Sequence, residues 1–323
     1  MSFLHHLVKI LALIALSGLL FSCSKPDEST GPVAGAEAKM DSLVSVEWLS
    51  QHLGDPGVVV LDSTVLVEPD GEGGLHTVNG RANYDAGHIP TAGFADLMGE
   101  LSDGDSPLDF AMPTPEQFVA AMGALGVSDD SRVVIYDAMN MAWAARVWWM
   151  LRWVGFDRAA LLDGGLGAWT AAGYPLSTES VNRAVGQLTL SLRPELIADR
   201  DEVLTSLEGS TVVLLDAMPP EHYRGEWVMY GRPGHIPGAS NLPSSLLLDE
   251  TGRFRQQDEL EMLVDSDRNA RTITYCGGGI AASANAFVLH RLGFTDVAIY
   301  AASLQEWAAN PANPMEMGDE APR

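Results

Sequence analysis

Cysteine is nearly absent from this sequence of 323 residues, which holds only Cys23 and Cys276. So few cysteines exclude a scaffold built on disulfide bonds, and no CxxC pair is present to bind a structural zinc ion. The motifs HExxH and GxxxxGKS/T are missing too, which removes the zinc-protease and P-loop interpretations.

Positive charge is also scarce. Lys and Arg number 19 against 43 Asp and Glu, a formal net charge of -24 that repels phosphate backbones and argues against nucleic-acid binding. Any anionic substrate must therefore find a local cationic pocket. Hydrophobic residues make up 46% and charged residues 19%, a balance that excludes global disorder. At roughly 100–200 residues per domain, the length predicts two domains.

The N-terminal segment is predicted to direct export. The run Ile10 to Phe21 is uncharged and too short to span a bilayer comfortably, but it suits the core of a signal peptide, which we place at residues 1–22. The sequence around Cys23 then resembles a bacterial lipobox, in which the cysteine is diacylated and becomes the mature N-terminus. The alternative is plain secretion with cleavage nearby.

Residues 23–40 are rich in Pro, Gly, Ala and Glu and are predicted to form a lipidated, flexible tether. We therefore expect an exported protein whose lipid anchors it to the bacterial membrane, facing the periplasm, with the outer membrane as one location. If Cys23 carries lipid, Cys276 is the one thiol left in a compartment that favours disulfides. Cys276 is then either buried as an inert side chain or kept as a functional thiol.

From Met40 onward, short β-branched runs alternate with helical segments, which is typical of parallel α/β units. Two halves share five landmarks in the same order, which indicates a duplication. They are the strands ending on Asp62 and Asp216, the segments Gly87–Pro90 and Gly234–Pro237, the strands leading to Asp137 and Cys276, Gly155-Phe156 and Gly293-Phe294, and Trp169 and Trp307. We predict a first domain at 41–178, a linker at 179–196 and a second domain at 197–323.

The surroundings of Cys276 point to chemistry at sulfur. A strand over Thr272–Tyr275 precedes it, Gly277, Gly278 and Gly279 follow, and a helix is expected from Ile280. Inward-facing amide groups and a helix N-terminus favour a thiolate or a persulfide anion, and the glycines are expected to leave room above the sulfur for a small anion. The alternative is an inert cysteine that fills the end of a strand.

At this point the sequence resembles the tandem-domain rhodaneses, the thiosulfate/3-mercaptopyruvate sulfurtransferases. The motifs that carry the resemblance are the two Gly-His-Ile-Pro segments, Tyr136-Asp137 followed by Arg146–Met150, and the Cys276 loop. It implies an α/β fold of two rhodanese-like domains, each a parallel sheet flanked by helices, with the first non-catalytic because Asp137 stands where Cys276 stands. It also implies sulfur transfer through a Cys276 persulfide, from a small anionic donor such as thiosulfate or 3-mercaptopyruvate to cyanide or a thiol acceptor. No metal or organic cofactor is implied.

The resemblance also assigns residues to the donor site. Arg146 matches an arginine that reaches the interdomain cleft and binds the donor's anionic end, and Asp62 matches an acid near the sulfur. The family often has arginine at the positions of Met218 and His222, with Arg224 close by here. Basic residues or a serine often follow the cysteine, where this chain has Gly277 and Gly278. The expected substrate site therefore comprises Arg146, Arg224, His222, Asp62 and the three glycines, and the donor's identity stays open.

Three other interpretations compete. Gly277–Ala282 fits a GxGxxA dinucleotide fingerprint, but the acid Asp296 precedes the next strand instead of ending it. A phosphatase of related fold needs an arginine six positions after its cysteine, and Ala282 stands there. The third alternative is a non-enzymatic, lipid-anchored module that binds or relays sulfur.

Overall fold

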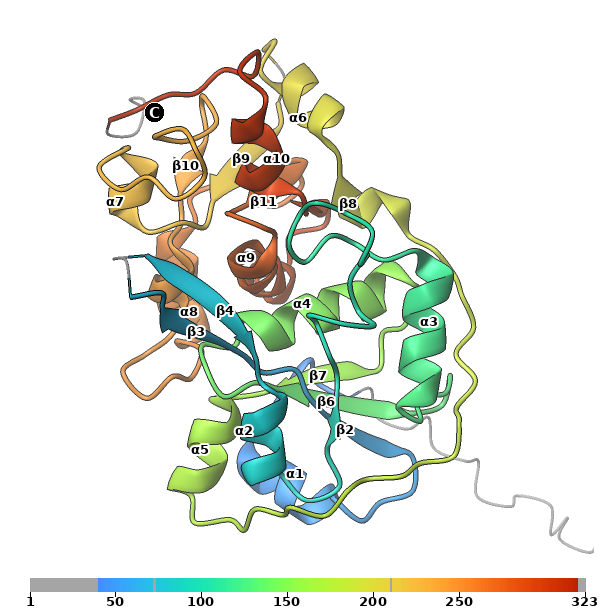
Figure 1. The fold of residues 1–323 in the computed structure, drawn as a ribbon. Helices are drawn as coiled ribbons and strands as arrows, with labels where there is room; N and C mark the ends of the chain where they lie inside the picture. Colours follow the sequence, from blue (N-terminus) through green and yellow to red (C-terminus); the bar gives the residue numbers. More distant parts are fainter. Residues whose placement is uncertain (1–39, 72–73, 210, 319–323) are drawn as a thin grey trace, which may run out of the picture. The chain divides into compact units, whose positions relative to one another are not determined.

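The computed structural model describes residues 40–71, 74–209 and 211–318 (Figure 1). The predicted signal peptide, Cys23 and nearly all of the predicted tether lie outside these residues. Of the helices in the described ranges, none has the length and apolar character that crossing a bilayer requires.

The first half of the described chain forms a five-stranded parallel sheet. Its strands, in spatial order, are β1 (Leu43–Val44), β7 (Ala159–Leu162), β6 (Arg132–Tyr136), β2 (Val58–Asp62) and β5 (Gly93–Phe94). Its helices are α1 (Val46–His52), α2 (Arg81–Ala86), α3 (Pro115–Ala124), α4 (Ala142–Trp153) and α5 (Gly165–Ala171). An antiparallel hairpin of β3 (Val65–Pro69) and β4 (Leu75–Asn79) stands apart from the sheet.

Both faces of this sheet are buried, which explains its continuous apolar strands. Every residue of β2 is buried; Val58 and Val60 face a cluster with residues of α1, α2 and α5, and Val59 and Leu61 face the cluster that includes α4. The alternation follows from the two-residue period of a strand.

The second half repeats the arrangement. Its strands, in spatial order, are β8 (Ile197–Ala198), β12 (Val297–Tyr300), β11 (Thr272–Tyr275), β9 (Val213–Asp216) and β10 (Ser240–Asn241). Its helices are α6 (Arg200–Ser206), α7 (Pro220–Tyr223), α8 (Gln257–Leu263), α9 (Ile280–Arg291) and α10 (Ser303–Ala309), with 3-10 turns η1 (Pro194–Leu196) and η2 (Ser244–Leu247). The two sheets have the same order of strands, all parallel, so the predicted duplication and α/β class are confirmed.

Between the last helix of the first half and η1, the chain runs without a helix or a strand of its own, apart from a bridge between Ser177 and His88. The predicted linker falls in this stretch, although its exact limits and those of the domains stay predictions.

The halves meet through α4 and α9, which lie between the two sheets (Figure 1). Trp148 of α4 packs edge-on against Phe287 of α9, with ring centroids 4.8 Å apart, and its indole N–H donates to the carbonyl of Ala159. Because α4 follows β6 and α9 follows β11, this contact also brings together the loops that precede the two helices. These are the loops that begin with Asp137 and Cys276.

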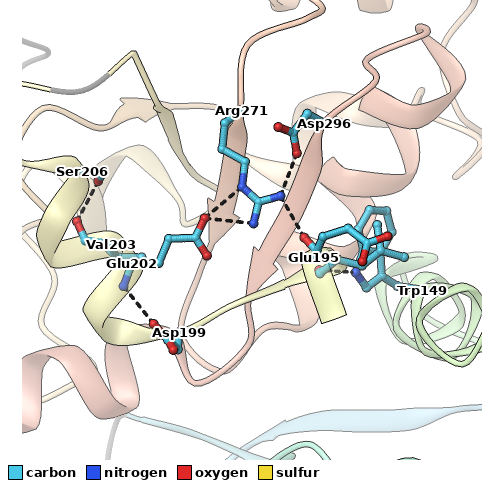
Figure 2. A network of polar contacts seen from close by, with 9 residues as sticks. Trp149, Glu195, Asp199, Glu202, Val203, Ser206, Arg271 and Asp296 are labelled. Atoms are coloured by element: carbon cyan, nitrogen blue, oxygen red, sulfur yellow. Dashed lines mark hydrogen bonds and ion pairs between the residues drawn. The ribbon is translucent and has the colours of Figure 1, made fainter. Parts of the chain in front are cut away.

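Arg271 fixes the other end of β11 (Figure 2). Its guanidinium pairs with Glu202 of α6 at 2.9 Å and with Asp296 at 2.7 Å, and it donates to the carbonyl of Glu195 at 2.8 Å. The indole of Trp149 reaches the same segment by donating to the carbonyl of Leu196. Asp296 thus lies before the amino end of β12 and is paired with Arg271. The acid of a dinucleotide-binding fold would end a strand instead, which agrees with rejecting that interpretation.

Asp216 ends β9 inside the second half. Its side chain is fully buried, and Oδ1 accepts the backbone N–H of Met218 at 2.7 Å. Burial raises the pKa of Asp216 to about 7, against the opposing effect of hydrogen bonds from Met218 and Tyr275. The folded chain therefore holds this proton more tightly than the unfolded chain does.

This shift predicts a pH-dependent stability. The contribution of a protonated Asp216 is complete below the unfolded pKa of about 4 and is lost as the pH rises through about 7. The full loss is on the order of 4 kcal/mol. We expect Asp216→Asn to flatten the fall in unfolding free energy between about pH 4 and 7, measured by urea denaturation followed through tryptophan fluorescence.

Asp105→Asn, which removes an exposed carboxylate, is the matched control and should keep the wild-type slope. An Asp216→Asn protein with that same slope would contradict the shift.

Candidate active site

Cys276 lies directly after β11 and is 3% exposed. Its Sγ accepts the backbone N–H of Gly279 at 3.1 Å, and its own N–H donates to the hydroxyl of Ser303 at 3.1 Å. Gly279 precedes α9 with a left-handed φ of 79°, a conformation that glycine adopts without a steric cost. The sulfur therefore sits at the amino end of a buried helix, where partial positive charge stabilises an anion.

Each of the three glycines accommodates a different polar side chain. A Cβ on Gly277 would overlap the hydroxyl of Tyr230, and one on Gly278 would overlap Nε2 of Gln305. A Cβ on Gly279 would lie 2.9 Å from Nη1 of Arg146. The space that side chains at these three positions would fill is thus occupied by three hydrogen-bond donors. Whether the glycines leave room above the sulfur for a small anion stays a prediction.

Arg146 is the cation of this cluster. It projects from α4 of the first half, is 1% exposed, and donates from Nη2 to the carbonyl of Phe110 at 2.9 Å. Nη1 has no hydrogen-bond partner among the described residues. Burial lowers the pKa of Arg146 to about 10, and an ionised Cys276 acts in the opposite direction. The guanidinium thus stays charged at neutral pH, with one nitrogen available to an anion beside the sulfur.

Tyr230 is a site residue that sequence reasoning missed. It lies in the loop after α7, with its ring 5.7 Å from that of His222 between centroids. Burial, with smaller effects of Cys276 and Asp109, raises the pKa of the Tyr230 hydroxyl, which therefore keeps its proton. No sequence pattern marks this tyrosine, because only the fold of the loop brings it to Gly277.

The His222 ring packs edge-on against the ring of Tyr230. It is fully buried, and neither ring nitrogen has a hydrogen-bond partner within the described ranges. Burial lowers the pKa of His222, so the imidazole is neutral unless an anion reaches it.

Gln305 of α10 joins the two halves at the glycine loop. Its backbone N–H donates to the carbonyl of Gly277 at 3.0 Å, while Oε1 accepts the N–H of Asp109 at 2.9 Å. Asp109 belongs to the first half and neighbours Phe110, which holds Arg146. Sequence reasoning missed Gln305 as well, because neither its type nor its spacing from Cys276 is distinctive.

Two predicted residues lie in other surroundings. Arg224 pairs with Glu226 through two contacts of 2.8 and 2.9 Å at the protein surface. Asp62 ends β2 in the first half, where it accepts the N–H of Thr64 at 2.9 Å and where burial raises its pKa. Neither is among the nearest neighbours of the three glycines. Their roles toward a substrate stay predictions.

The equivalent loop of the first half is filled by its own carboxylate. Asp137 accepts three backbone N–H groups, from Met139 at 2.8 Å, Met141 at 3.1 Å and Ala144 at 2.9 Å. Met141 takes the left-handed position before α4 that Gly279 takes before α9. A carboxylate saturates this loop and cannot carry a sulfane sulfur, which agrees with a non-catalytic first half.

Comparisons with known proteins agree with this geometry. The model of the rhodanese-like domain matches residues 45–172 and 199–310. The chain is 34% identical to the 3-mercaptopyruvate sulfurtransferase of Escherichia coli over 282 residues, covering 84% of this chain and 97% of the relative. It is 33% identical to thiosulfate/3-mercaptopyruvate sulfurtransferase 2 of Arabidopsis thaliana over 319 residues, covering 87% and 91%. The crystal structure of SseA from Escherichia coli superposes with a TM-score of 0.73 at 32% identity, covering 82% of this chain and 99% of SseA.

The overlap at Gly277 predicts an energetic coupling to Tyr230. We expect Gly277→Ala to lower the free energy of unfolding by about 1–3 kcal/mol, because the new methyl group displaces the Tyr230 hydroxyl. In a Tyr230→Ala background the same substitution should cost less than about 1 kcal/mol. Urea denaturation of the four proteins measures the coupling.

Gly167→Ala is the matched control, since this glycine lies in α5 with open space at its Cβ and the substitution should not destabilise. Equal costs of Gly277→Ala in both backgrounds would mean that Tyr230 does not occupy the space above Gly277.

Proposed function

Because the chain belongs to the rhodanese family and carries two rhodanese-like domains, we propose that it transfers sulfane sulfur through a persulfide on Cys276, with thiosulfate or 3-mercaptopyruvate as donor. The observation that carries the proposal is the Cys276 sulfur at the amino end of α9, beside the buried guanidinium of Arg146. The names of the Escherichia coli and Arabidopsis thaliana relatives support 3-mercaptopyruvate, and the second also supports thiosulfate.

The first half-reaction loads the cysteine. The Cys276 thiolate attacks the outer sulfur of thiosulfate, the S–S bond of the donor breaks, and sulfite leaves with the bonding electron pair. With 3-mercaptopyruvate the carbon–sulfur bond breaks instead, and the enolate that leaves takes up a proton to become pyruvate. In both cases the product on the protein is a Cys276 persulfide.

The second half-reaction unloads it. Cyanide or a thiolate attacks the outer sulfur, the persulfide bond breaks, and the electron pair returns to Cys276 as a thiolate. The N–H of Gly279 and the amino end of α9 stabilise this negative charge each time it forms. No oxidant or reductant is consumed over the cycle.

Arg146 holds the donor in this proposal. Its free Nη1 points to the glycine loop, where a sulfonate or carboxylate oxygen can accept its hydrogen bonds. His222, whose ring packs against Tyr230, is proposed to add a second contact when the loop rearranges around the donor. Arg224 and Asp62 are further candidates for the same donor site.

Export and membrane anchoring through Cys23 are a separate proposal, supported by the uncharged run at residues 10–21 and the cysteine that follows it. When the full sequence is expressed in a bacterial host supplied with radiolabelled palmitate, the protein should become labelled. Cys23→Ala should abolish the label, and equal labelling of the two proteins would exclude lipidation at Cys23.

Mass spectrometry of the intact protein tests the persulfide. After treatment with thiosulfate or 3-mercaptopyruvate, the protein should gain the mass of one sulfur atom on Cys276, and thiocyanate should form when cyanide is added. Cys276→Ser should gain no sulfur and form no thiocyanate. If the wild-type protein gains no sulfur from either donor, the proposal fails; gain without measurable turnover would favour the non-enzymatic relay.

Arg146→Met separates binding from folding. Removing a buried, half-paired cation in favour of an apolar side chain of similar length should leave the unfolding free energy unchanged or raise it. The apparent KM for the donor should rise by at least about tenfold, since the anion loses its partner. Steady-state thiocyanate formation and urea denaturation measure the two effects.

Arg268→Met, which removes an exposed arginine paired with Glu261, should change neither quantity. An unaltered donor KM in Arg146→Met would reject the assigned role.

A further inference from the structure

The sulfur of Cys276 is closed in. Cys276 is 3% exposed, and Gly277, Gly278 and Gly279 are all buried. A cavity of about 370 Å³ lies nearby, lined among others by Asp109, Ala301 and Glu306, but Cys276 and the glycines do not line it. At 3% exposure, a donor reaches the sulfur only if a group packed around Cys276 moves.

The three side chains packed against the glycines that follow Cys276 differ in how firmly they are held. Arg146 and Gln305 project from helices and are tied to the backbone of Phe110 and Asp109. Tyr230 lies in the segment Val228–Gly231, which makes no backbone hydrogen bond within the part of the chain that the structure describes. Moving Tyr230 therefore breaks no backbone hydrogen bond of its segment. Moving Gln305 would break its bond to Asp109 across the two halves, and moving Arg146 would break its bond to Phe110.

Both ends of this segment are anchored. Trp227 donates its N–H to the carbonyl of Glu221 at 3.1 Å, and the Arg232 guanidinium donates to four backbone carbonyls. Those carbonyls belong to Trp307, Ala308, Asn310 and Asn313. Gly231, between Tyr230 and the Arg232 anchor, has a left-handed φ of 79°. A short span between fixed ends can turn one side chain outward but cannot open widely.

We propose that Tyr230 determines the donor specificity of the Cys276 site: its ring blocks the path to the sulfur and swings aside for small anionic donors but not for bulky ones. The inference rests on the proposed function and names which donors that function accepts. The space that a displaced phenol ring vacates lies at Gly277 and is large enough for a donor of a few heavy atoms, while the unpaired Nη1 of Arg146 lies at Gly279 in the same loop. A larger donor would have to move the backbone that Trp227 and Arg232 hold.

Alkylation of Cys276 tests this without any sulfur transfer. The full chain with Cys23→Ser has Cys276 as its one thiol, and its rate of modification is measured with iodoacetamide and with N-(1-pyrenyl)maleimide. We expect Tyr230→Ala to raise the rate with the bulky maleimide by at least about tenfold and the rate with iodoacetamide by less than about threefold. Tyr230→Phe, which keeps the ring, should stay within about twofold of the parent for both reagents.

Val228→Ala, at an exposed neighbour in the same segment, is the matched control and should keep both rates. Tyr230→Trp should slow the bulky reagent further, which keeps a test available if Tyr230→Ala does not fold. An unchanged ratio of the two rates in Tyr230→Ala, or an unchanged bulky rate in Tyr230→Trp, would overturn the proposal.

The same variants are then compared with sulfur donors of two sizes, thiosulfate and an aryl thiosulfonate. Tyr230→Ala should raise kcat/KM for the aryl donor relative to thiosulfate by at least about tenfold. If the wild-type protein takes sulfur from no donor, the proposed function fails while the alkylation rates still decide the role of Tyr230. If sulfur transfer occurs but the donor preference does not shift, the specificity role fails and the function stands.

Discussion

The contact between α4 and α9 is the constraint on which the site depends. Each helix follows the loop at the carboxyl end of the central strand of its own sheet, so packing one helix on the other places both loops at the junction of the halves. Trp148 of α4 and Phe287 of α9 pack together at the interface, and Arg146 of α4 reaches the start of α9. A cation from the first half and a sulfur from the second thereby share one buried environment.

Burial of Arg146 shows how this environment is specialised. Taking a guanidinium out of water costs several kcal/mol unless partners replace the lost solvation. Here the carbonyl of Phe110 replaces part of it, and Nη1 lacks a protein partner within the described chain. A site that retains an incompletely paired cation next to a nucleophile is suited to binding an anion, because the anion supplies the missing contact.

The loop at the carboxyl end of the central strand plays a different role in each half. In the first half the Asp137 carboxylate accepts three amide N–H groups and closes the loop on itself. In the second half the sulfur accepts the N–H of Gly279, and the glycines admit side chains from two helices and a loop. The glycines are therefore required by what surrounds the loop as much as by its own backbone.

Local sequence determined the fold and the position of the nucleophile. Continuous apolar strands, the repeated landmarks and the strand–cysteine–glycine–helix order predicted the duplicated α/β fold and singled out Cys276, because these patterns follow from hydrogen-bonding and burial rules that act over a few residues. Arg146 was found through the resemblance, since its neighbours Trp148 and Trp149 belong to a recognisable motif.

The placement of Tyr230 and Gln305 at the glycine loop was determined only by the tertiary structure. They approach the glycines across 47 and 27 residues of chain, and the same fold turns Arg224 toward Glu226 and keeps Asp62 within the first half. Which side chains meet at one point depends on how whole elements pack, and no local pattern encodes that.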